Sequence, residues 1–444
     1  MTYCFILGHN PTLSVAEITR VLVGDFRVVE LSAHVLIIES QKELPAEQLQ
    51  QQLGGTIKIG QIISRINTNF NTNNTNIIRA ICDELVRISG PAKRFYFGFS
   101  LYSLSSHEAM KKYQLQIKPL AMEIKKVLKN LGLSSRWVSS KKEVLSSVIV
   151  QKNKLLTQGA EFCFLIGAKN IYPHTKIFGV GINLARTLSC QEVDEYSYYD
   201  FGRPARSMKQ GMLPPKLAKI MINLAQAPQS GIILDPFCGV GTVLQEAARL
   251  GYQHLIGSDI SQQAIDNTKV NLRWLAENAQ FSISNFQPIL QAQGWPELVE
   301  GQANPNLQIF QSDIKDISQK VTPDSIDAIV TEPYLGPIDK TEDSHQISKI
   351  ISELSDLYLA AFRELKQILK KDRRLVIVFP VFKEGVRLHY LPIMDEVKKQ
   401  GWQIVNPVPS ELRKNLVIKI TARDSIIYSR PDQMVLREIL VFQH

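Results

Sequence analysis

The chain has 444 residues, 44% of them hydrophobic and 21% charged, which is typical of a soluble globular protein. At roughly 100–200 residues per domain, this length predicts two to four domains. No apolar run approaches the ~20 residues that a membrane span needs, and the first residues, "MTYCFILGHN", lack the features of a secretory signal. The five cysteines form no CxxC pair, so neither a zinc site nor a disulfide framework is indicated, and a reducing cytoplasm is expected.

The net charge of +9 is unevenly distributed along the chain. Residues 1–90 carry −1, whereas residues 91–190 hold 16 Lys and Arg but only 4 Asp and Glu, a net +12. A basic segment beside nearly neutral neighbours is typical of a protein that binds a polyanion, most simply nucleic acid. A solvated, lysine-rich surface that aids solubility is the alternative. The RNA-contacting candidates in this segment are Lys93, Arg94, Lys111, Lys112, Arg136, Lys141, Lys142, Lys152 and Lys154.

Short strands and amphipathic helices alternate in residues 1–90 and predict a small α+β domain. Residues 91–193 continue with the strand-like "RFYFGFSLY" and a long basic helix that ends near Gly132. This second region suits a compact RNA-binding module, and a purely structural domain is the alternative. The polar segment 194–211, "DEYSYYDFGRPARSMKQG", is predicted to be a linker, in which Arg203 and Arg206 either touch RNA or make ordinary interdomain contacts.

From residue 212 onward, buried strands alternate regularly with helices. This alternation predicts βαβ units and a mainly parallel sheet. The tail "SIIYSRPDQMVLREILVFQ" predicts an antiparallel hairpin that turns at Pro431-Asp432. The expected fold class is therefore α/β for residues 212–444, preceded by α+β domains.

The segment "DPFCGVGT" (235–242) joins the first of these strands to a helix. Gly239 and Gly241 permit a tight turn and a close approach of the backbone to a ligand. A phosphate-binding GxxxxGK[ST] motif is absent, and the third glycine of a dinucleotide-binding GxGxxG is missing. Asp235 at the strand end instead suits a cationic ligand, and S-adenosyl-L-methionine, with its ammonium and sulfonium groups, is such a ligand.

Two further acids close the next strands. Asp259 ends "IGSD" and can accept hydrogen bonds from ribose hydroxyls, and Asp313 follows "FQS" and can accept from an adenine amino group. Each has an alternative role as a helix N-cap. Three acids at successive strand ends are nevertheless expected to meet at one edge of the sheet.

The fourth strand, "SIDAIV", runs into "TEPYLG" (331–336). An exocyclic amine on a base is a poor nucleophile, and hydrogen bonds accepted from it orient its lone pair towards the methyl donor. Amino-methyltransferases use an Asp/Asn-Pro-Pro-Tyr motif for this purpose, in which the aromatic ring stacks on the base. Alignment on Pro333-Tyr334 places Thr331 at the acid or amide and Glu332 at the first proline.

These motifs, with "GMLPPKLAKIMINLA" and "YSRPDQMVLREI", resemble those of the THUMP-containing tRNA guanine-N2 methyltransferases. That family includes archaeal enzymes acting on guanosine 10 of tRNA and their eukaryotic relatives. The resemblance implies a ferredoxin-like domain (1–90), a THUMP RNA-binding domain (91–193), a linker (194–211) and a Rossmann-like class I methyltransferase domain (212–444). It also implies tRNA as partner. No metal is expected, because the positive sulfur of the donor already activates the leaving group, and no membrane is expected, because no apolar run is long enough to span one. An accessory subunit, as eukaryotic relatives use, is neither indicated nor excluded.

The resemblance further implies two sets of site residues. The base would be held by Thr331, Glu332, Pro333 and Tyr334. The expected S-adenosyl-L-methionine contacts are Asp235, Pro236, Phe237, Cys238, Gly239, Gly241, Thr242, Asp259, Ile260, Asp313 and Ile314. A ribosomal RNA or DNA amino-methyltransferase is an alternative function, and so is an RNA-binding protein whose methyltransferase motif has drifted to inactivity.

Overall fold

The computed structural model describes residues 1–22, 24, 26–66, 74–88, 94–104, 107–168, 181–206, 212–278, 306–337, 344–430 and 433–444. The chain forms two compact units, one of residues 1–15 and 22–194 and the other of residues 16–21 and 195–444. In the described parts of the chain, no helix combines the length and apolarity that a bilayer span requires.

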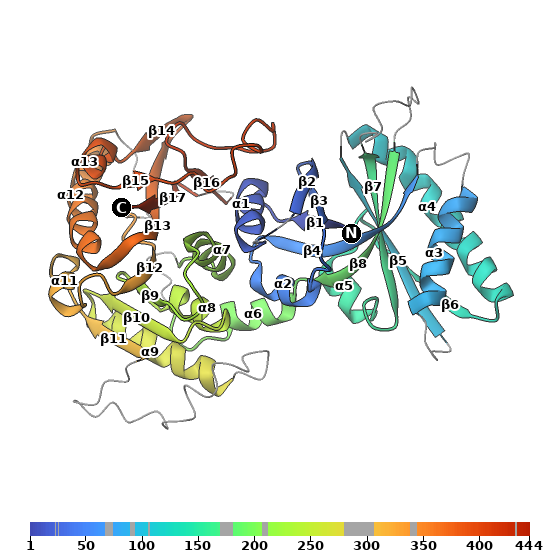
Figure 1. Ribbon diagram of the computed structural model, residues 1–444, viewed down its shortest axis with the longest axis horizontal. Helices are drawn as coiled ribbons and strands as arrows, with labels where there is room; N and C mark the ends of the chain where they lie inside the picture. Colours follow the sequence, from blue (N-terminus) through green and yellow to red (C-terminus); the bar gives the residue numbers. More distant parts are fainter. Residues whose placement is uncertain are drawn as a thin grey trace. The chain divides into compact units, whose positions relative to one another are not determined.

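Within its described residues, the first unit contains an eight-stranded sheet in the order β2-β3-β1-β4-β8-β7-β5-β6 (Figure 1). Its strands are β1 (Thr2–Leu7), β2 (Phe26–Leu31), β3 (Val35–Ser40), β4 (Thr56–Ile66), β5 (Arg94–Ser103), β6 (Ser134–Val138), β7 (Gly159–Ala168) and β8 (Gly181–Cys190). The helices of this part of the chain are α1 (Pro11–Val21), α2 (Ala46–Gln52), α3 (Asn74–Ile88), α4 (His107–Asn130) and α5 (Ser147–Lys152).

The predicted boundary at residue 90 falls inside this sheet. Strand β4, from the first ninety residues, pairs antiparallel with β8, from the predicted second domain, over the registers from Lys58↔Cys190 to Ile66↔Ile182. An unpaired strand edge exposes a row of N–H and C=O groups, and the pairing removes one such edge from each half. The two predicted N-terminal domains therefore share one continuous sheet, a relationship that hydrophobic periodicity alone does not reveal.

The second unit has, within its described residues, a nine-stranded sheet with the main order β11-β10-β9-β12-β13-β17-β15 (Figure 1). Its strands are β9 (Ile232–Asp235), β10 (His254–Asp259), β11 (Leu307–Gln311), β12 (Ile326–Thr331), β13 (Leu369–Glu384), β14 (Arg387–Tyr390), β15 (Gln403–Ile404), β16 (Ile426–Tyr428) and β17 (Val435–Gln443). Its helices are α6 (Val193–Phe201), α7 (Pro215–Ala225), α8 (Thr242–Arg249), α9 (Gln262–Glu277), the 3-10 helix η1 (Ile314–Asp316), α11 (Ile317–Lys320), α12 (Ser344–Ile368) and α13 (Met394–Lys399).

Strands β9 to β13 run parallel, and β17 is antiparallel to β13. The predicted tail hairpin is present as the antiparallel pair β16–β17, although its predicted turn at Pro431-Asp432 lies outside the described residues. The mainly parallel sheet with an antiparallel edge confirms the α/β, Rossmann-like architecture expected for this half of the chain.

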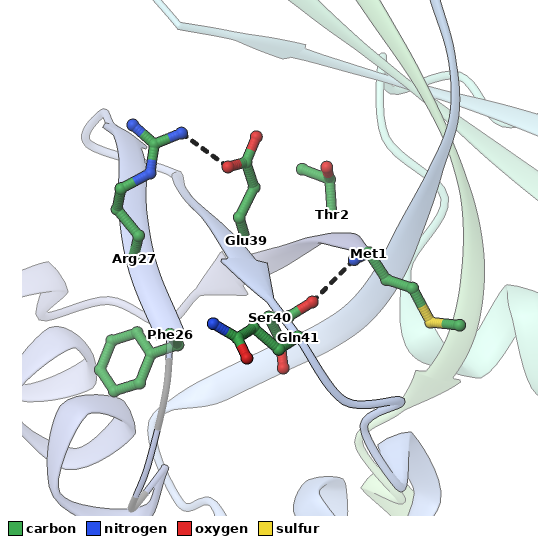
Figure 2. A pocket seen from close by; sticks show the side chains of 7 residues that line it. All are labelled: Met1, Thr2, Phe26, Arg27, Glu39, Ser40 and Gln41. Carbon is green, nitrogen blue, oxygen red and sulfur yellow. Dashed lines mark hydrogen bonds and ion pairs between the residues drawn. The ribbon is translucent and has the colours of Figure 1, made fainter.

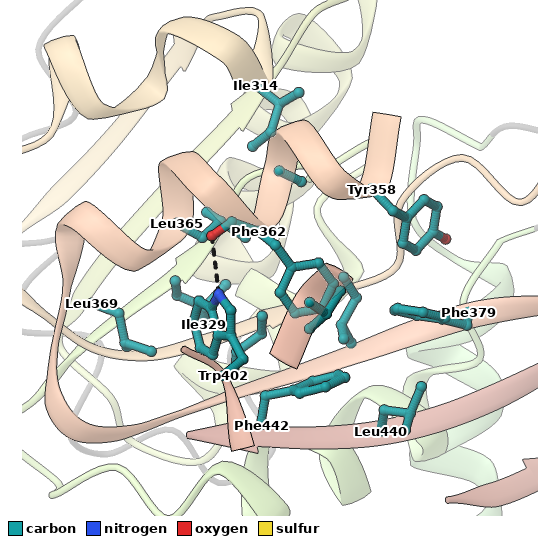
Figure 3. Packing of buried hydrophobic residues seen from close by; sticks show 14 of the residues in the cluster. Ile314, Ile329, Tyr358, Phe362, Leu365, Leu369, Phe379, Trp402, Leu440 and Phe442 are labelled. Atoms are coloured by element: carbon teal, nitrogen blue, oxygen red, sulfur yellow. Dashed lines mark hydrogen bonds between the residues drawn. The ribbon is translucent and has the colours of Figure 1, made fainter. Parts of the chain in front are cut away.

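A dense aromatic core holds α12 against the sheet (Figure 3). Phe362 of α12 lies among Phe379, Trp402 and Phe442, with ring centroids 4.9–6.0 Å apart and steeply tilted planes. The Trp402 indole N–H donates to the Phe362 carbonyl at 3.2 Å, so its polar atom is satisfied inside the core. Such aromatic packing makes the sheet a rigid support for the residues at its strand ends.

The predicted linker is partly helical. Helix α6 buries Tyr196 and Tyr199, and Arg249 of α8 stacks 4.1 Å from the centroid of the Tyr199 ring. Trp274 of α9 lies 5.8 Å from the same ring. The aromatic residues of "DEYSYYDF" therefore anchor this segment to the second unit, where its polar composition had predicted a free connection.

Candidate active site

The strand order of the second unit reverses between β9 and β12. From β9 the chain builds outward through β10 to β11, and it then returns to the other side of β9 to add β12 and β13. In open parallel sheets, ligands bind beyond the carboxyl ends of the strands at such a reversal. Asp235, Asp259 and Thr331 all end strands at this edge, and the register pairs Gly257 with Asp235.

Asp235 lies at the reversal and is almost completely buried. Its Oδ1 accepts the Thr331 hydroxyl at 2.6 Å and the Phe237 backbone N–H at 3.2 Å. Burial raises the pKa of Asp235 to about 7, and the hydrogen bond from Thr331 partly opposes that rise. The charges of Asp259 and Glu332 raise the pKa further, so three carboxylates act on one another at this edge.

The loop after β9 is shaped by its two glycines. Gly239 has φ +55°, and a Cβ built on it would meet no atom of the described residues within 4 Å, so this part of the loop leaves open space for a ligand. The Gly239 N–H donates to Asp259 Oδ2 at 3.0 Å, and its carbonyl accepts the Thr268 hydroxyl at 2.9 Å. Gly241, at φ +81°, packs against the Thr268 side chain, where a Cβ would be crowded. These contacts fix the loop beside the ends of β9 and β10.

Asp259 and Asp313 close the neighbouring strands. Asp259 Oδ1 also accepts the Ser261 N–H at 2.9 Å, and its backbone carbonyl accepts the Ser312 N–H, which brings the end of β11 to the same edge. Asp313 caps η1 through a hydrogen bond from Lys315 N–H at 3.0 Å, which is the capping role that its sequence position also allowed. Ile260 is 65% exposed, whereas Ile314 is buried.

The remaining residues of the expected cofactor loop are less accessible. Pro236, Cys238 and Thr242 are buried, and Phe237 is half-buried. The Thr242 hydroxyl accepts a hydrogen bond from Arg203 Nη1 at 2.8 Å. Arg203 is itself only 3% exposed, so it stabilises the start of α8 and does not serve as the RNA contact suggested by the linker sequence.

At the end of β12, Thr331 is fully buried inside the sheet and Glu332 is the first residue beyond it. The Glu332 carboxylate is held by the Arg437 guanidinium of β17, with Oε2–Nε 2.5 Å and Oε1–Nη2 3.0 Å. Pro333 is buried, and Tyr334 is 52% exposed. Sequence reasoning missed Arg437, although it lies in the motif "YSRPDQMVLREI", because only the sheet topology brings it to Glu332.

These residues fit S-adenosyl-L-methionine. The open approach to Gly239 leaves room for the ligand, and the carboxylates of Asp235 and Asp259 suit its cationic and hydroxyl groups. The exposed Ile260 offers an apolar surface next to Asp259. Each carboxylate oxygen has two lone pairs, so the backbone hydrogen bonds to Asp259 leave acceptor capacity for ribose.

The expected RNA-binding residues lie in the first unit. Arg94 and Arg136 are exposed on the adjacent parallel strands β5 and β6. Lys111 and Lys112 lie in α4, and Lys93 lies outside the described residues. The other four are exposed, namely Lys141, Lys142, Lys152 and Lys154.

A cavity of about 580 Å³ lies at the end of α4 and was not anticipated from the sequence. Among the described residues, its lining includes Lys125, Lys126 and Lys129 with Ser134 and Ser135, and no acid. A second cavity of about 630 Å³, at the β2–β3 edge, is different in kind (Figure 2). There Arg27 pairs with Glu39 at 2.6 Å, so its charges are balanced locally.

A family model described as "RMKL-like, methyltransferase domain" matches residues 203–388, and a model described as "DNA methylase" matches residues 48–270, half of the chain. A crystal structure of TrmN from Thermus thermophilus covers 100% of this chain and 99% of its own, with 13% identity and a TM-score of 0.49. The parallel sheet, its acidic strand ends and both family models define the chain as an S-adenosyl-L-methionine-dependent methyltransferase.

Two curated relatives carry the same name. The tRNA (guanine(10)-N2)-dimethyltransferase of Methanocaldococcus jannaschii is 27% identical over 37% of this chain and 41% of its own length. Its counterpart in Methanothermobacter thermautotrophicus is 29% identical over 33% of this chain and 34% of its own. Over these segments the chain is similar to tRNA guanine-N2 methyltransferases. The matches span well under half of each relative's length.

Proposed function

We propose that this protein transfers a methyl group from S-adenosyl-L-methionine to the exocyclic N2 of a guanosine in tRNA. The observation that carries the proposal is the convergence of Asp235, Asp259 and Glu332 at the reversal of strand order, beside the open loop at Gly239. The names of the curated relatives support guanine N2 as the acceptor and tRNA as the substrate. A cytoplasmic location accords with this substrate.

In this proposal the chain's residues divide into two groups. Asp235 and Asp259 bind the donor, which when bound supplies an electrophilic methyl carbon activated by its positive sulfur. Glu332 accepts hydrogen bonds from the guanine amine and orients the nitrogen lone pair, and the half-exposed Tyr334 stacks on the base. Holding the two reactants in one geometry supplies much of the rate acceleration.

The first unit would hold the tRNA. We assign residues 1–90 as a ferredoxin-like domain and residues 91–193 as a THUMP domain that share one sheet, followed by a connecting segment (194–211) and the methyltransferase domain (212–444). The lysine cavity, lined by Lys125, Lys126 and Lys129, offers phosphates three cations, and no acid is among its described lining residues. With the exposed arginines and lysines of the same +12 segment, it forms the proposed RNA surface.

The direct test is a methyl-transfer reaction. Purified protein, unmodified tRNA and isotopically labelled S-adenosyl-L-methionine are incubated, and digested nucleosides are identified by mass spectrometry. Label in N2-methylguanosine supports the proposal. Label in adenosine or cytidine, or transfer to ribosomal RNA or DNA but not to tRNA, would replace it with another amino-methyltransferase activity, and tRNA binding without transfer would indicate an inactive RNA-binding protein.

A further inference from the structure

Two polar residues lie at the carboxyl end of β12, Thr331 within the strand and Glu332 just after it, and only Glu332 is partly exposed. Thr331 is completely buried, and its single hydroxyl hydrogen is donated to Asp235. A base amine cannot approach an oxygen enclosed within a packed sheet. Glu332, immediately beyond the strand, is therefore the side chain of this segment that can accept hydrogen bonds from a base.

Arg437 determines where the Glu332 carboxylate lies. Its guanidinium meets both carboxylate oxygens, at 2.5 Å and 3.0 Å, and the two side chains are only 6% and 10% exposed. A bidentate guanidinium–carboxylate pair is planar and directional, and this one is protected from solvent screening. Strand β13 extends beyond the end of β12, and there its Pro380 pairs with Arg437 of β17. This register allows Arg437 to contact Glu332, the first residue after β12.

The pair leaves Glu332 able to accept further hydrogen bonds. A carboxylate has about four acceptor positions, and Arg437 occupies one on each oxygen. Glu332 also lies close enough to Asp235, at the end of β9, for its charge to contribute to the raised pKa of that carboxyl. The positive charge of Arg437 offsets part of the negative charge that three carboxylates bring to this edge.

We propose that Arg437 is a positioning residue for methyl transfer, orienting the Glu332 carboxylate so that it accepts hydrogen bonds from the exocyclic amine of the target base. This rests on the proposed function. The amine nitrogen's lone pair forms the N–C bond while the C–S bond breaks and its electrons remain on sulfur. The nitrogen then loses one proton to Glu332, which releases it to solvent.

Arg437→Gln tests this role. Loss of orientation should lower kcat for tRNA methylation about 100-fold, with the KM for tRNA and the Kd for S-adenosyl-L-methionine changed less than about threefold. Arg437→Lys keeps the charge but not the bidentate geometry, and it should remain at least about tenfold slow. In an otherwise identical Glu332→Gln background, adding Arg437→Gln should change kcat little, because Arg437 acts through Glu332.

Arg423→Gln is the matched control. Arg423 pairs at 3.4 Å with Glu438, the next residue of β17, whose side chain points to the opposite face of the strand. This variant breaks a comparable ion pair without touching Glu332, and it should retain wild-type kcat. Thermal unfolding of each variant identifies any that fail to fold, and Arg437→Lys then carries the test.

The outcomes separate the two hypotheses. If wild-type protein methylates tRNA but folded Arg437→Gln or Arg437→Lys matches its kcat, the positioning role is wrong. Additive losses in the Glu332→Gln background also contradict it, because they show that Arg437 acts independently of Glu332. Absence of methylation by the wild-type protein overturns the proposed function itself.

Discussion

The Thr331 hydroxyl donates to the Asp235 carboxylate over 2.6 Å, joining the ends of the two strands between which the sheet reverses its order. The bond satisfies an acceptor of the buried Asp235 carboxylate. It also leaves the buried Thr331 hydroxyl without a hydrogen to donate to a base. The pKa of Asp235 therefore depends on a residue 96 positions away in the sequence.

Thr331→Val keeps the shape of the side chain but removes this donor. A buried carboxyl that loses a hydrogen bond should lower the free energy of unfolding by about 1–3 kcal/mol. The pKa of Asp235 should rise further, because the Thr331 bond holds it down. Urea unfolding at pH 7.5 measures the change. Thr331→Ser, which keeps the hydroxyl, is the control and should lie close to wild type; an equal loss in both variants would point to packing instead.

Binding of the donor should depend on pH. Burial raises the pKa of Asp235 to about 7, and a cationic ligand favours the ionised carboxylate. The Kd for S-adenosyl-L-methionine should therefore be about tenfold weaker at pH 6 than at pH 8, with proton release on binding. Calorimetry in buffers of different ionisation enthalpy measures both quantities. A Kd that is constant across this range would show that Asp235 does not bind the cation.

The same pKa predicts the stability of Asp235→Asn. Because the folded-state pKa lies above the usual aspartate value of 3.8, the contribution of Asp235 to stability is fully present below about pH 4 and is lost as the pH rises through about 7. The neutral amide avoids this loss, so the ligand-free variant should be more stable than wild type at pH 8, by an amount on the order of 1–4 kcal/mol, and close to it at pH 4. Urea unfolding at pH 4 and pH 8 measures the difference in stability between Asp235→Asn and wild type. If the variant is less stable than wild type at pH 8, the raised pKa of Asp235 is contradicted.

Two glycines with nearly the same backbone geometry allow a matched test of the donor loop. Gly239 (φ +55°) and Gly385 (φ +59°) would each place a Cβ in open space. Alanine at either position should cost about 1–2 kcal/mol of backbone strain. Only Gly239→Ala should weaken S-adenosyl-L-methionine binding, because its Cβ enters the space assigned to the ligand. Equal donor affinities in the two variants would place the ligand elsewhere.

The lysine cavity is tested by combined Lys125→Gln, Lys126→Gln and Lys129→Gln. The variant should bind tRNA more weakly, and its binding should depend less steeply on salt, by about 0.7–0.9 in log–log slope for each phosphate that is no longer neutralised. The control replaces Lys371, Lys398 and Lys399, which are exposed in the second unit, with Gln. Filter binding across a salt series gives both slopes. Unchanged affinity in the cavity variant would remove this surface from the proposed RNA site.

Strand–helix alternation and terminal acids were sufficient to group the strand-end acids at one edge of the sheet. The alternation of strands with helices predicts a parallel sheet, and the carboxyl ends of parallel strands share one edge, so the sequence alone groups Asp235 with Asp259. The Asp259 carboxylate indeed receives the Gly239 N–H. Their roles in binding a donor stay predictions.

Other features depend on topology that the sequence does not display. Arg437 reaches Glu332 across 105 residues because β17 joins the sheet antiparallel beyond β13. The pairing of β4 with β8 likewise depends on which strand edges are free to meet, and local periodicity does not encode that. The sequence of α6 predicted a linker because its tyrosines are surrounded by polar residues. In the structure, Tyr196 and Tyr199 are buried.

The central claim, that acids at the strand ends hold S-adenosyl-L-methionine, is tested most directly by equilibrium dialysis of the labelled donor. We predict saturable binding of one donor per wild-type chain and a Kd at least about tenfold weaker for Asp259→Asn, since two ribose hydrogen bonds to a charged acceptor are impaired. Asp266→Asn, at an exposed acid of α9 whose carboxylate accepts a hydrogen bond from Gln262, should bind like wild type. Absence of binding by the wild-type protein, or wild-type affinity in Asp259→Asn, would contradict this claim.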